Sequence, residues 1–268
     1  MSFKDLPEEI ILVILSHLSE TKDIIRFSLS DKRNNKIVND NKEMFYYIKK
    51  VLIYTDSKKN KICEDIKIGN LIGNIEINVY NVKINVEYIE PYISKINKFN
   101  IKYNEHNDQI NDEDLLVLNK VNILELIECR RIRNISSLGS ETSKIHTLNL
   151  SKCRNITDVS SLGSETSKIH TLDLSYCTNI RDISSLGSET SKIHTLNLSR
   201  CRNIKDISSL GSETSKIHTL NLSYCTNIRD ISSLGCETSK IHTLKLIGCY
   251  IEKKYINNLN NKINNIIY

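Results

Sequence analysis

Cysteine and histidine, the side chains best able to bind a transition metal or to serve as a nucleophile and its base, recur at one fixed interval in this chain. Six cysteines are 24 residues apart, namely Cys129, Cys153, Cys177, Cys201, Cys225 and Cys249. Five histidines keep the same step, namely His146, His170, His194, His218 and His242. A zinc site needs ligands that surround one point, commonly as C-x₂₋₄-C pairs. One ligand per interval therefore predicts single-file rows and no metal site.

The two rows have structural interpretations. We expect the cysteines to point inward, where each fills space or bridges backbone groups of adjacent turns. We expect the histidines to form a stacked polar edge whose charging makes the protein sensitive to pH. Cys236 replaces a serine of the other intervals, which predicts an exposed free thiol. The sequence has no nucleophile–base pair, glycine-rich phosphate loop or paired carboxylates, so we expect a non-catalytic protein without a cofactor.

The elements that position these rows follow from one unit, "IHTLNLSKCRNITDVSSLGSETSK" at 145–168. Leu148 and Leu150 are two residues apart, as in a strand with one buried face. The later apolar positions 156–162 are spaced by three, which fits a short 3₁₀-like return, and Gly163 lies in a turn. One unit cannot bury its own apolar face. Neighbouring units must therefore stack into a solenoid of parallel strands about 4.8 Å apart.

This unit resembles the leucine-rich repeat. The pattern L-x-x-L-x-L-x-x-(N/C)-x-(I/L) stands at Ile145, Leu148, Leu150, Cys153 and Ile156. The "D-(I/V)-S-S-L" that follows is similar to the return segment of the compact bacterial-type and cysteine-containing subclasses. The resemblance implies an α/β repeat fold with a parallel β-sheet on the concave face.

The chain divides into three regions. Residues 121–264 hold six 24-residue repeats, and we expect the last of them to cap the solenoid. Residues 50–120 contain the alternating runs "IEINV" (75–79) and "FNIKY" (99–103), which predict diverged turns of the same solenoid. Residues 1–49 lack the period and predict a small helical unit.

The N-terminal unit contains "LPEEIILVILSHLSETKDIIRFSLSDKRNNKIVND", whose first helix we expect to be capped by Asp5, with Pro7 in its first turn. This segment resembles an F-box. The tryptophan that usually follows the Lys-Arg pair in that family is absent. In that family the motif binds the adaptor subunit of SCF-type cullin–RING ubiquitin ligases. The matching positions are Leu6, Pro7, Ile10, Ile14, Leu15, Leu18, Ile24 and Leu29.

An F-box followed by leucine-rich repeats is a known family architecture, in which the repeats hold a substrate protein. The resemblance therefore implies a substrate receptor that binds an SCF adaptor, through it a cullin, and an unidentified target. The alternative is a stand-alone interaction scaffold whose N-terminal helices only cap the solenoid.

The outward positions of the strands are the candidate target-binding face. The residues we expect to contact a target are Asn149, Lys152, Asp173, Tyr176, Asn197, Arg200, Asn221 and Tyr224. The predicted outward set also includes threonines 147, 171, 195 and 219 and serines 151, 175, 199 and 223. Tyr176, Arg200 and Tyr224 are the best anchors because such side chains dominate interface energetics.

Charge and composition restrict the class of partner. The net charge is +5, and successive repeats carry +1 and −1, a mixed pattern that argues against a nucleic-acid groove. No apolar run approaches the roughly 20 residues of a membrane span. We expect a cytoplasmic or nuclear protein with its cysteines as thiols. The abundance of Asn, Ile, Lys and Tyr indicates an A/T-rich genome, from a protist or a large DNA virus; a viral protein would act in the host cytoplasm.

Overall fold

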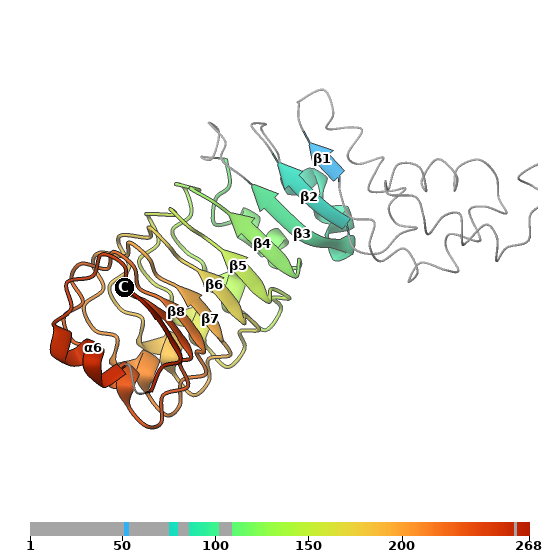
Figure 1. Ribbon diagram of the computed structural model, residues 1–268. Helices are drawn as coiled ribbons and strands as arrows, with labels where there is room; N and C mark the ends of the chain where they lie inside the picture. The colour runs from blue at the N-terminus through green and yellow to red at the C-terminus, as the bar shows by residue number, and fades with distance from the viewer. Residues whose placement is uncertain (1–50, 54–74, 80–85, 102–108, 260–261) are drawn as a thin grey trace, which may run out of the picture.

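The computed structural model describes residues 51–53, 75–79, 86–101, 109–259 and 262–268. In these ranges ten strands stack in sequence order, β1 to β10, into one parallel sheet (Figure 1). The helical unit predicted for 1–49, with its eight adaptor-binding positions, lies outside the described residues.

The strands are short and are joined by short helical turns. The strands are β1 (Val51–Ile53), β2 (Ile75–Val79), β3 (Ile96–Ile101), β4 (Ile123–Leu126), β5 (Thr147–Asn149), β6 (Thr171–Asp173), β7 (Thr195–Asn197), β8 (Thr219–Asn221), β9 (Thr243–Lys245) and β10 (Asn265–Ile267). The 3₁₀ helices are η5 (Val86–Tyr88), η6 (Glu90–Lys95), η7 (Ser136–Gly139), η8 (Ser160–Gly163), η9 (Ser184–Gly187), η10 (Ser208–Gly211) and η11 (Ser232–Gly235), and the α-helices are α5 (Asp114–Leu118) and α6 (Lys253–Leu259). The predicted 3₁₀-like or irregular return is a 3₁₀ helix in five of the repeats, η7 to η11, whereas the last repeat has the α-helix α6 at this place.

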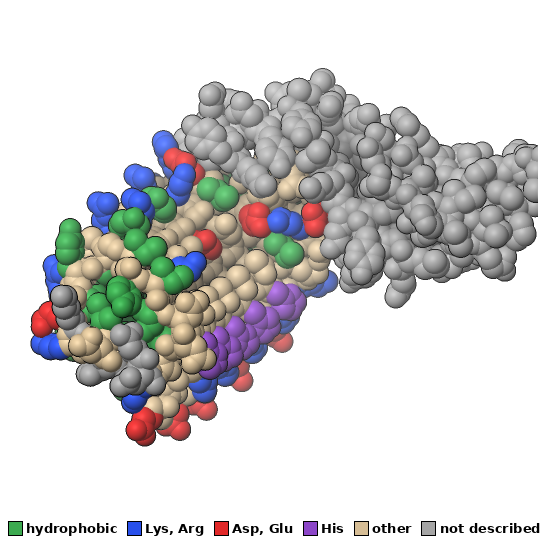
Figure 2. All heavy atoms as spheres, viewed as in Figure 1, with side chains coloured by type: hydrophobic (Ala, Val, Ile, Leu, Met, Phe, Trp, Pro, Cys, Tyr) green, Lys and Arg blue, Asp and Glu red, His purple; other side chains and the backbone are tan. Residues whose placement is uncertain are grey.

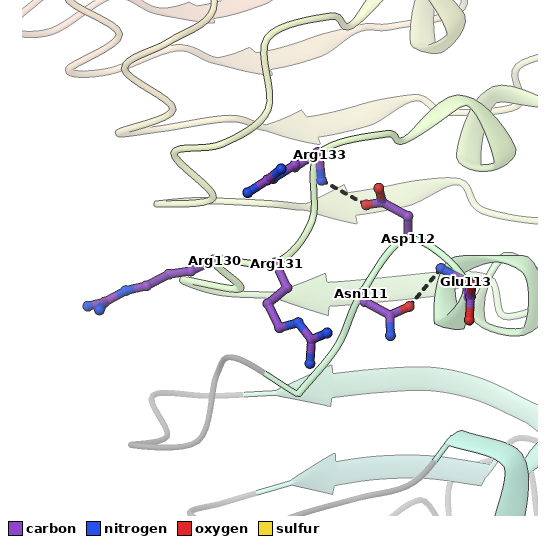
Figure 3. Close-up of a pocket in the computed structure, with 6 residues that line it drawn as sticks. All are labelled: Asn111, Asp112, Glu113, Arg130, Arg131 and Arg133. Carbon is purple, nitrogen blue, oxygen red and sulfur yellow. Dashed lines mark hydrogen bonds between the residues drawn. The ribbon is translucent and has the colours of Figure 1, made fainter.

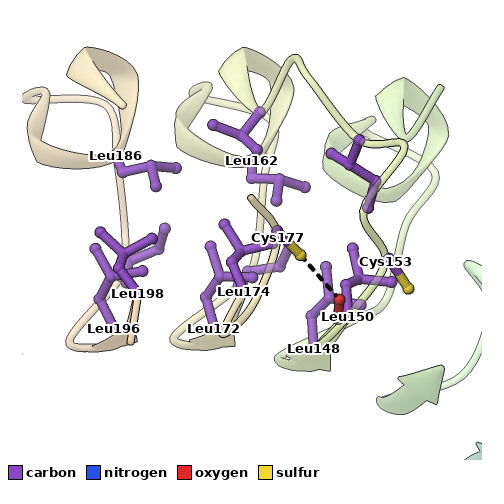
Figure 4. Packing of buried hydrophobic residues seen from close by; sticks show 14 of the residues in the cluster. Leu148, Leu150, Cys153, Leu162, Leu172, Leu174, Cys177, Leu186, Leu196 and Leu198 are labelled. Carbon is purple, nitrogen blue, oxygen red and sulfur yellow. Dashed lines mark hydrogen bonds between the residues drawn. The ribbon is translucent and has the colours of Figure 1, made fainter. Parts of the chain in front are cut away.

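The core is a set of leucine and isoleucine ladders that run along the solenoid. Leu148 pairs in register with Leu172, which pairs with Leu196. These leucines are at most 1% exposed, and Figure 4 shows them facing the leucines of the 3₁₀ turns. Because every turn has the same 24-residue length, like side chains of consecutive turns lie in contact. Each turn thus buries its apolar side chains against the next.

The cysteine row links consecutive turns, as the sequence predicts. Cys177 Sγ donates to the carbonyl oxygen of Leu150 at 3.1 Å, one turn back (Figure 4). Cys201 and Cys225 repeat the contact on Leu174 and Leu198. Burial raises the pKa of these thiols, that of Cys225 to about 12. The row therefore consists of neutral hydrogen-bond donors that satisfy buried carbonyl groups.

Glycine ends the 3₁₀ turns η7 to η11, and in η7 to η10 the next turn lies directly against it. A Cβ added at Gly163 would lie 2.1 Å from the carbonyl oxygen of Ser185, and one at Gly187 would lie 2.2 Å from that of Ser209. The obstacle is backbone and cannot rotate away. Only glycine permits this spacing of turns.

The C-terminal segment does more than cover the last turn. Helix α6 is followed by β10, which pairs in parallel with β9 and adds a strand to the sheet. The backbone N–H of Leu246 donates to the carbonyl oxygen of Ile267 at 2.7 Å. The expectation of a simple cap was therefore incomplete.

Within the described ranges, no helix has the length and apolar character needed to cross a bilayer.

Candidate protein-interaction face

One row of the face consists of aligned amide and carboxylate side chains. Asn149, Asp173, Asn197 and Asn221, here called the asparagine row, are paired in register on β5 to β8 and are partly exposed. Each side chain accepts the backbone N–H two residues later, with oxygen–nitrogen distances of 2.8 to 3.1 Å. Asn197 Nδ2 also donates to Asp173 Oδ2 at 2.8 Å. These candidate contact residues therefore also end their strands, and their orientation is fixed.

The serines predicted to face outward beyond this row do not all do so. Ser151, Ser175 and Ser223 are 8%, 7% and 5% exposed. The strand ends at the asparagine row, and the alternation of sides ends with it. The prediction of an outward serine row was wrong at these positions because the chain already turns inward there.

The residue before each cysteine has a left-handed backbone. Lys152, Tyr176, Arg200 and Tyr224, with Glu128 before them, have φ between 60° and 64° and are here called the loop row. The backbone N–H of Tyr176 donates to the carbonyl oxygen of Ser199 at 2.8 Å, and Arg200, one turn on, makes the same bond to Ser223. This bond to the next turn holds the strained conformation in place. All four predicted contact residues of the row thus share one backbone geometry.

Tyr176, Arg200 and Tyr224 form a continuous stack across three turns. The guanidinium carbon of Arg200 lies 5.0 Å from the ring centroid of Tyr176 and 4.3 Å from that of Tyr224. Both distances are within the range of a cation–π interaction. The ring of Tyr224 lies over Gly248, where an added Cβ would come within 2.5 Å of it. The sequence identified these three residues as anchors but did not predict that they contact one another.

The histidine row lies along the opposite edge of the sheet, at the start of the strands (Figure 2). Successive rings are stacked with centroids 5.3 to 5.7 Å apart, as expected from the period. Desolvation lowers the pKa of His194, and the neighbouring charges of His170, His218 and Lys216 lower it further. The neutral form is therefore favoured in the middle of the row.

Charge is divided unequally between the two edges. The loop edge comprises the segments between strand and 3₁₀ turn, at 128–134, 152–158, 176–182, 200–206 and 224–230. It holds ten Lys or Arg against five Asp or Glu, a net charge of +5. The return edge comprises the segments that lead back to the strands, at 140–146, 164–170, 188–194, 212–218 and 236–242. It holds five Lys and five Glu, a net charge of zero.

Four of the five acids of the loop edge, all of them aspartates, accept a hydrogen bond from the backbone. Asp158 Oδ1 accepts the backbone N–H of Ser160 at 2.8 Å, and Asp182, Asp206 and Asp230 repeat this cap on their own turns. The same backbone hydrogen bonds lower the pKa of these carboxyls. These carboxylates sit at the start of the 3₁₀ turns, six residues beyond the loop row. Figure 2 shows Lys and Arg side chains along the loop edge.

Three arginines surround an open hollow on the loop edge of the early turns. Arg130, Arg131 and Arg133 line it together with Asn111, Asp112 and Glu113, and its volume is about 480 Å³ (Figure 3). Asp112 Oδ1 accepts the backbone N–H of Arg133 at 2.7 Å, and Arg130 forms an ion pair with Glu128 at 3.1 Å. These arginines were not among the site residues predicted from the sequence. The signal that could have identified them is the excess of basic residues between strand and 3₁₀ turn. This excess is not visible when charges are summed over whole repeats.

Among the described residues, no three His, Cys, Asp or Glu side chains are placed to hold a metal ion together. The two rows present their side chains one per turn. What the face offers is instead a wide, rigid surface of amides, tyrosine rings and guanidinium groups, which are the groups that recognise protein surfaces.

No protein-family model matches the sequence, and no curated protein matches it significantly. Solved structures resemble it in fold at low identity. An internalin from Listeria monocytogenes is 16% identical over 74% of this chain and 72% of its own, with a TM-score of 0.49. A chain of the yeast Rad7 and Elc1 complex is 14% identical over 82% of this chain, with a TM-score of 0.50.

The leucine-rich-repeat ectodomain of a membrane receptor kinase from Arabidopsis thaliana is 12% identical over 74% of this chain, with a TM-score of 0.28. The chain spans 63% of the yeast chain and 35% of the plant ectodomain. In-register parallel strands, one per repeat, are joined through stacked 3₁₀ turns, and the yeast chain shares this fold. The chain therefore has the fold of a leucine-rich-repeat solenoid.

Proposed function

We propose that the chain is the substrate-recognition receptor of an SCF-type cullin–RING ubiquitin ligase. Its N-terminal segment binds the adaptor subunit, and through it a cullin, while the solenoid binds a target protein. The chain itself is not catalytic. It supplies proximity and orientation, which bring the target to a ubiquitin-charged enzyme held by other subunits.

The observation that carries this proposal is the rigid side-chain surface of the solenoid in a chain that begins with a sequence resembling an F-box. The stack of Tyr176, Arg200 and Tyr224 presents aromatic and guanidinium groups of the kind that dominate interface energetics. The yeast chain of related fold was crystallised in a complex of two proteins, Rad7 and Elc1. We carry over from it the idea that a chain of this fold forms a complex with a second protein.

Co-expression with the SCF adaptor of the host, followed by affinity capture of this chain, tests the proposal. The wild-type chain is expected to retain the adaptor at one copy per chain. Leu6→Asp/Pro7→Ala is expected to release it while the thermal unfolding transition stays unchanged. Leu116→Asp is the matched control, since Leu116 is 61% exposed on α5 in the solenoid.

A variant pair that loses stability together with its adaptor would favour the alternative, a scaffold whose N-terminus only caps the solenoid. A wild-type chain that is folded and never retains the adaptor would overturn the receptor proposal.

A further inference from the structure

We propose that the loop edge is the docking surface for an acidic segment of the target, with Arg200 as the residue that pairs with an aspartate or glutamate carboxylate. This inference rests on the proposed function only in that the solenoid is the part that holds the target. It specifies which edge of the solenoid is used and the chemical class of the segment that is held.

Arg200 is positioned for such a contact, and no described residue forms an ion pair with its guanidinium group. The guanidinium group is stacked between Tyr176 and Tyr224. Its N–H groups make no hydrogen bond or ion pair with any described residue, while Arg130 on the same edge is paired with Glu128. Stacking uses the faces of the guanidinium plane and leaves the donors at its rim free to bind a carboxylate in bidentate geometry.

The side chains around Arg200 cannot supply that carboxylate. The nearest acid of the sheet face in sequence, Asp173, already accepts from Ser175 N and from Asn197 Nδ2. The next acid along the chain, Asp206, caps the 3₁₀ turn at Ser208. Both carboxylates are therefore held by other donors, and among the described residues neither of these two acids is available to Arg200.

The position of Arg200 is fixed by the backbone. Its φ is 63°, and its N–H donates to Ser223 on the next turn at 2.8 Å. A long side chain usually loses conformational entropy when it binds. The two tyrosine rings and the fixed backbone reduce that loss beforehand, which favours affinity.

The field along the edge extends the site beyond one residue. The loop edge has a net charge of +5, while the return edge has a net charge of zero. Lys152 and Arg154 precede Arg200 by two turns, and Arg202 follows it by two residues in the sequence. A segment with several carboxylates is therefore attracted along the edge and fixed at Arg200.

A protein segment fits this edge better than a nucleic acid. Nucleic-acid grooves need a continuous row of positive charge along a phosphate backbone. Here a capping aspartate accompanies the basic residues on each of four consecutive turns, from Asp158 to Asp230. Separate carboxylates on a peptide can contact single arginines and avoid these acids.

Selection from a display library of random dodecapeptides, with the full chain as bait, tests the inference. The recovered peptides are expected to be rich in Asp and Glu. Arg200→Gln as bait is expected to lose them, while Arg181→Gln, which removes one exposed charge from the same edge, is expected to keep them. Neutral or basic recovered peptides, or no enrichment at all, would overturn the acidic class.

Fluorescence anisotropy with the most enriched peptide measures the contribution of Arg200. Arg200→Gln is expected to weaken binding at least about tenfold, equivalent to about 1.4 kcal/mol. Arg200→Lys is expected to recover only part of the loss, because it restores the charge without the planar fork. Equal affinity in wild type and Arg200→Gln, at unchanged thermal stability, would overturn the anchor.

Two further probes test the source of the anion. Tighter binding of the same peptide with phosphoserine in place of glutamate would overturn the carboxylate assignment. Tighter Arg200-dependent binding of a labelled twelve-nucleotide oligothymidylate would overturn the choice of a protein segment. The same bait is also tested for capture of the adaptor. If it retains the adaptor but binds no acidic peptide, the inference about the loop edge fails while the receptor proposal stands.

Discussion

The guanidinium carbon of Arg200 lies 4.3 Å from the ring centroid of Tyr224, across the boundary between two turns of the solenoid. Two side chains that are 24 residues apart in sequence therefore act as neighbours. The same repeat that stacks leucines inside the solenoid also stacks the side chains of Arg200 and Tyr224 on its surface. The repeat therefore orders side chains on the surface as well as in the core.

This contact is expected to stabilise the fold modestly. In a double-mutant cycle with Arg200→Gln and Tyr224→Leu, we predict a coupling energy of about 0.5 to 1 kcal/mol, the range of a partly exposed cation–π pair. The free energy of unfolding in urea gives the measurement. Arg181→Gln combined with Tyr224→Leu serves as the control pair and should show no coupling. Additive effects of Arg200 and Tyr224 would show that the stack has no energetic significance.

Replacing a turn glycine is expected to be far more damaging. Gly187→Ala places a Cβ 2.2 Å from the carbonyl oxygen of Ser209, so two turns must separate. We predict a loss of about 3 kcal/mol in the free energy of unfolding, at the upper end of the usual cost of overpacking. Glu189→Ala, an exposed change two residues away, should alter stability by less than about 0.5 kcal/mol. Urea denaturation of both variants makes the comparison, and similar stability of the two would contradict the close approach.

The cysteines are expected to separate sharply in reactivity. Among the described cysteines Cys236 is exposed, whereas the five from Cys129 to Cys225 are buried and Cys249 is partly buried. In a Cys63→Ser background, brief treatment of the native protein with iodoacetamide at pH 8 should modify Cys236 first. Burial raises the pKa of the Cys177, Cys201 and Cys225 thiols and so removes the reactive thiolate. Peptide mass mapping identifies the site, and early modification of Cys177 would contradict the buried ladder.

The histidine row predicts lower stability in mild acid. The pKa of His194 in the fold is below its ordinary value of 6.5, mainly through desolvation, so the unfolded chain binds this proton more readily. Stability from this group is present above about pH 6.5 and falls as the pH drops through that value. The capping aspartates, whose ordinary pKa is 3.8, titrate at lower pH.

Unfolding free energies at pH 7.5 and pH 5.5 measure this effect. The difference between the two is expected to be smaller in His194→Gln than in wild type. His146→Gln, at the end of the row with one stacked neighbour, is the control and should retain more of the difference. Equal pH dependence in wild type and His194→Gln would exclude the row as its source.

The repeat period was sufficient to predict most of the fold. Leu148 and Leu150 placed the strand. One cysteine per turn predicted an inward thiol that either bridges adjacent turns or fills space, and the structure shows the bridge. The left-handed backbone of Tyr176 and Arg200 could not be predicted, because residues with side chains rarely adopt it. The one local signal was Gly248 at the equivalent position.

The sequence predicted which residues belong to the site but not the contacts between their side chains. Asn149 was chosen as an outward contact, and the structure adds that its side chain also caps Ser151. The stack around Arg200 depends on distances between turns, which the sequence of one turn does not contain. The tenth strand was missed because Ile267, which lies in it, is four residues after Ile263 and so also fits the spacing of a helix.

In the proposed function, one chain holds an adaptor at one end and an acidic target segment on its solenoid. The most direct test is the mass of the complex that the chain forms with both partners, measured by size-exclusion chromatography with light scattering. With the SCF adaptor and the selected acidic peptide fused to a small carrier protein, we predict one copy of each per chain. Arg200→Gln should lose only the carrier, and Leu6→Asp/Pro7→Ala only the adaptor. A chain that binds the two partners in competition, or that never binds the adaptor, would contradict the account.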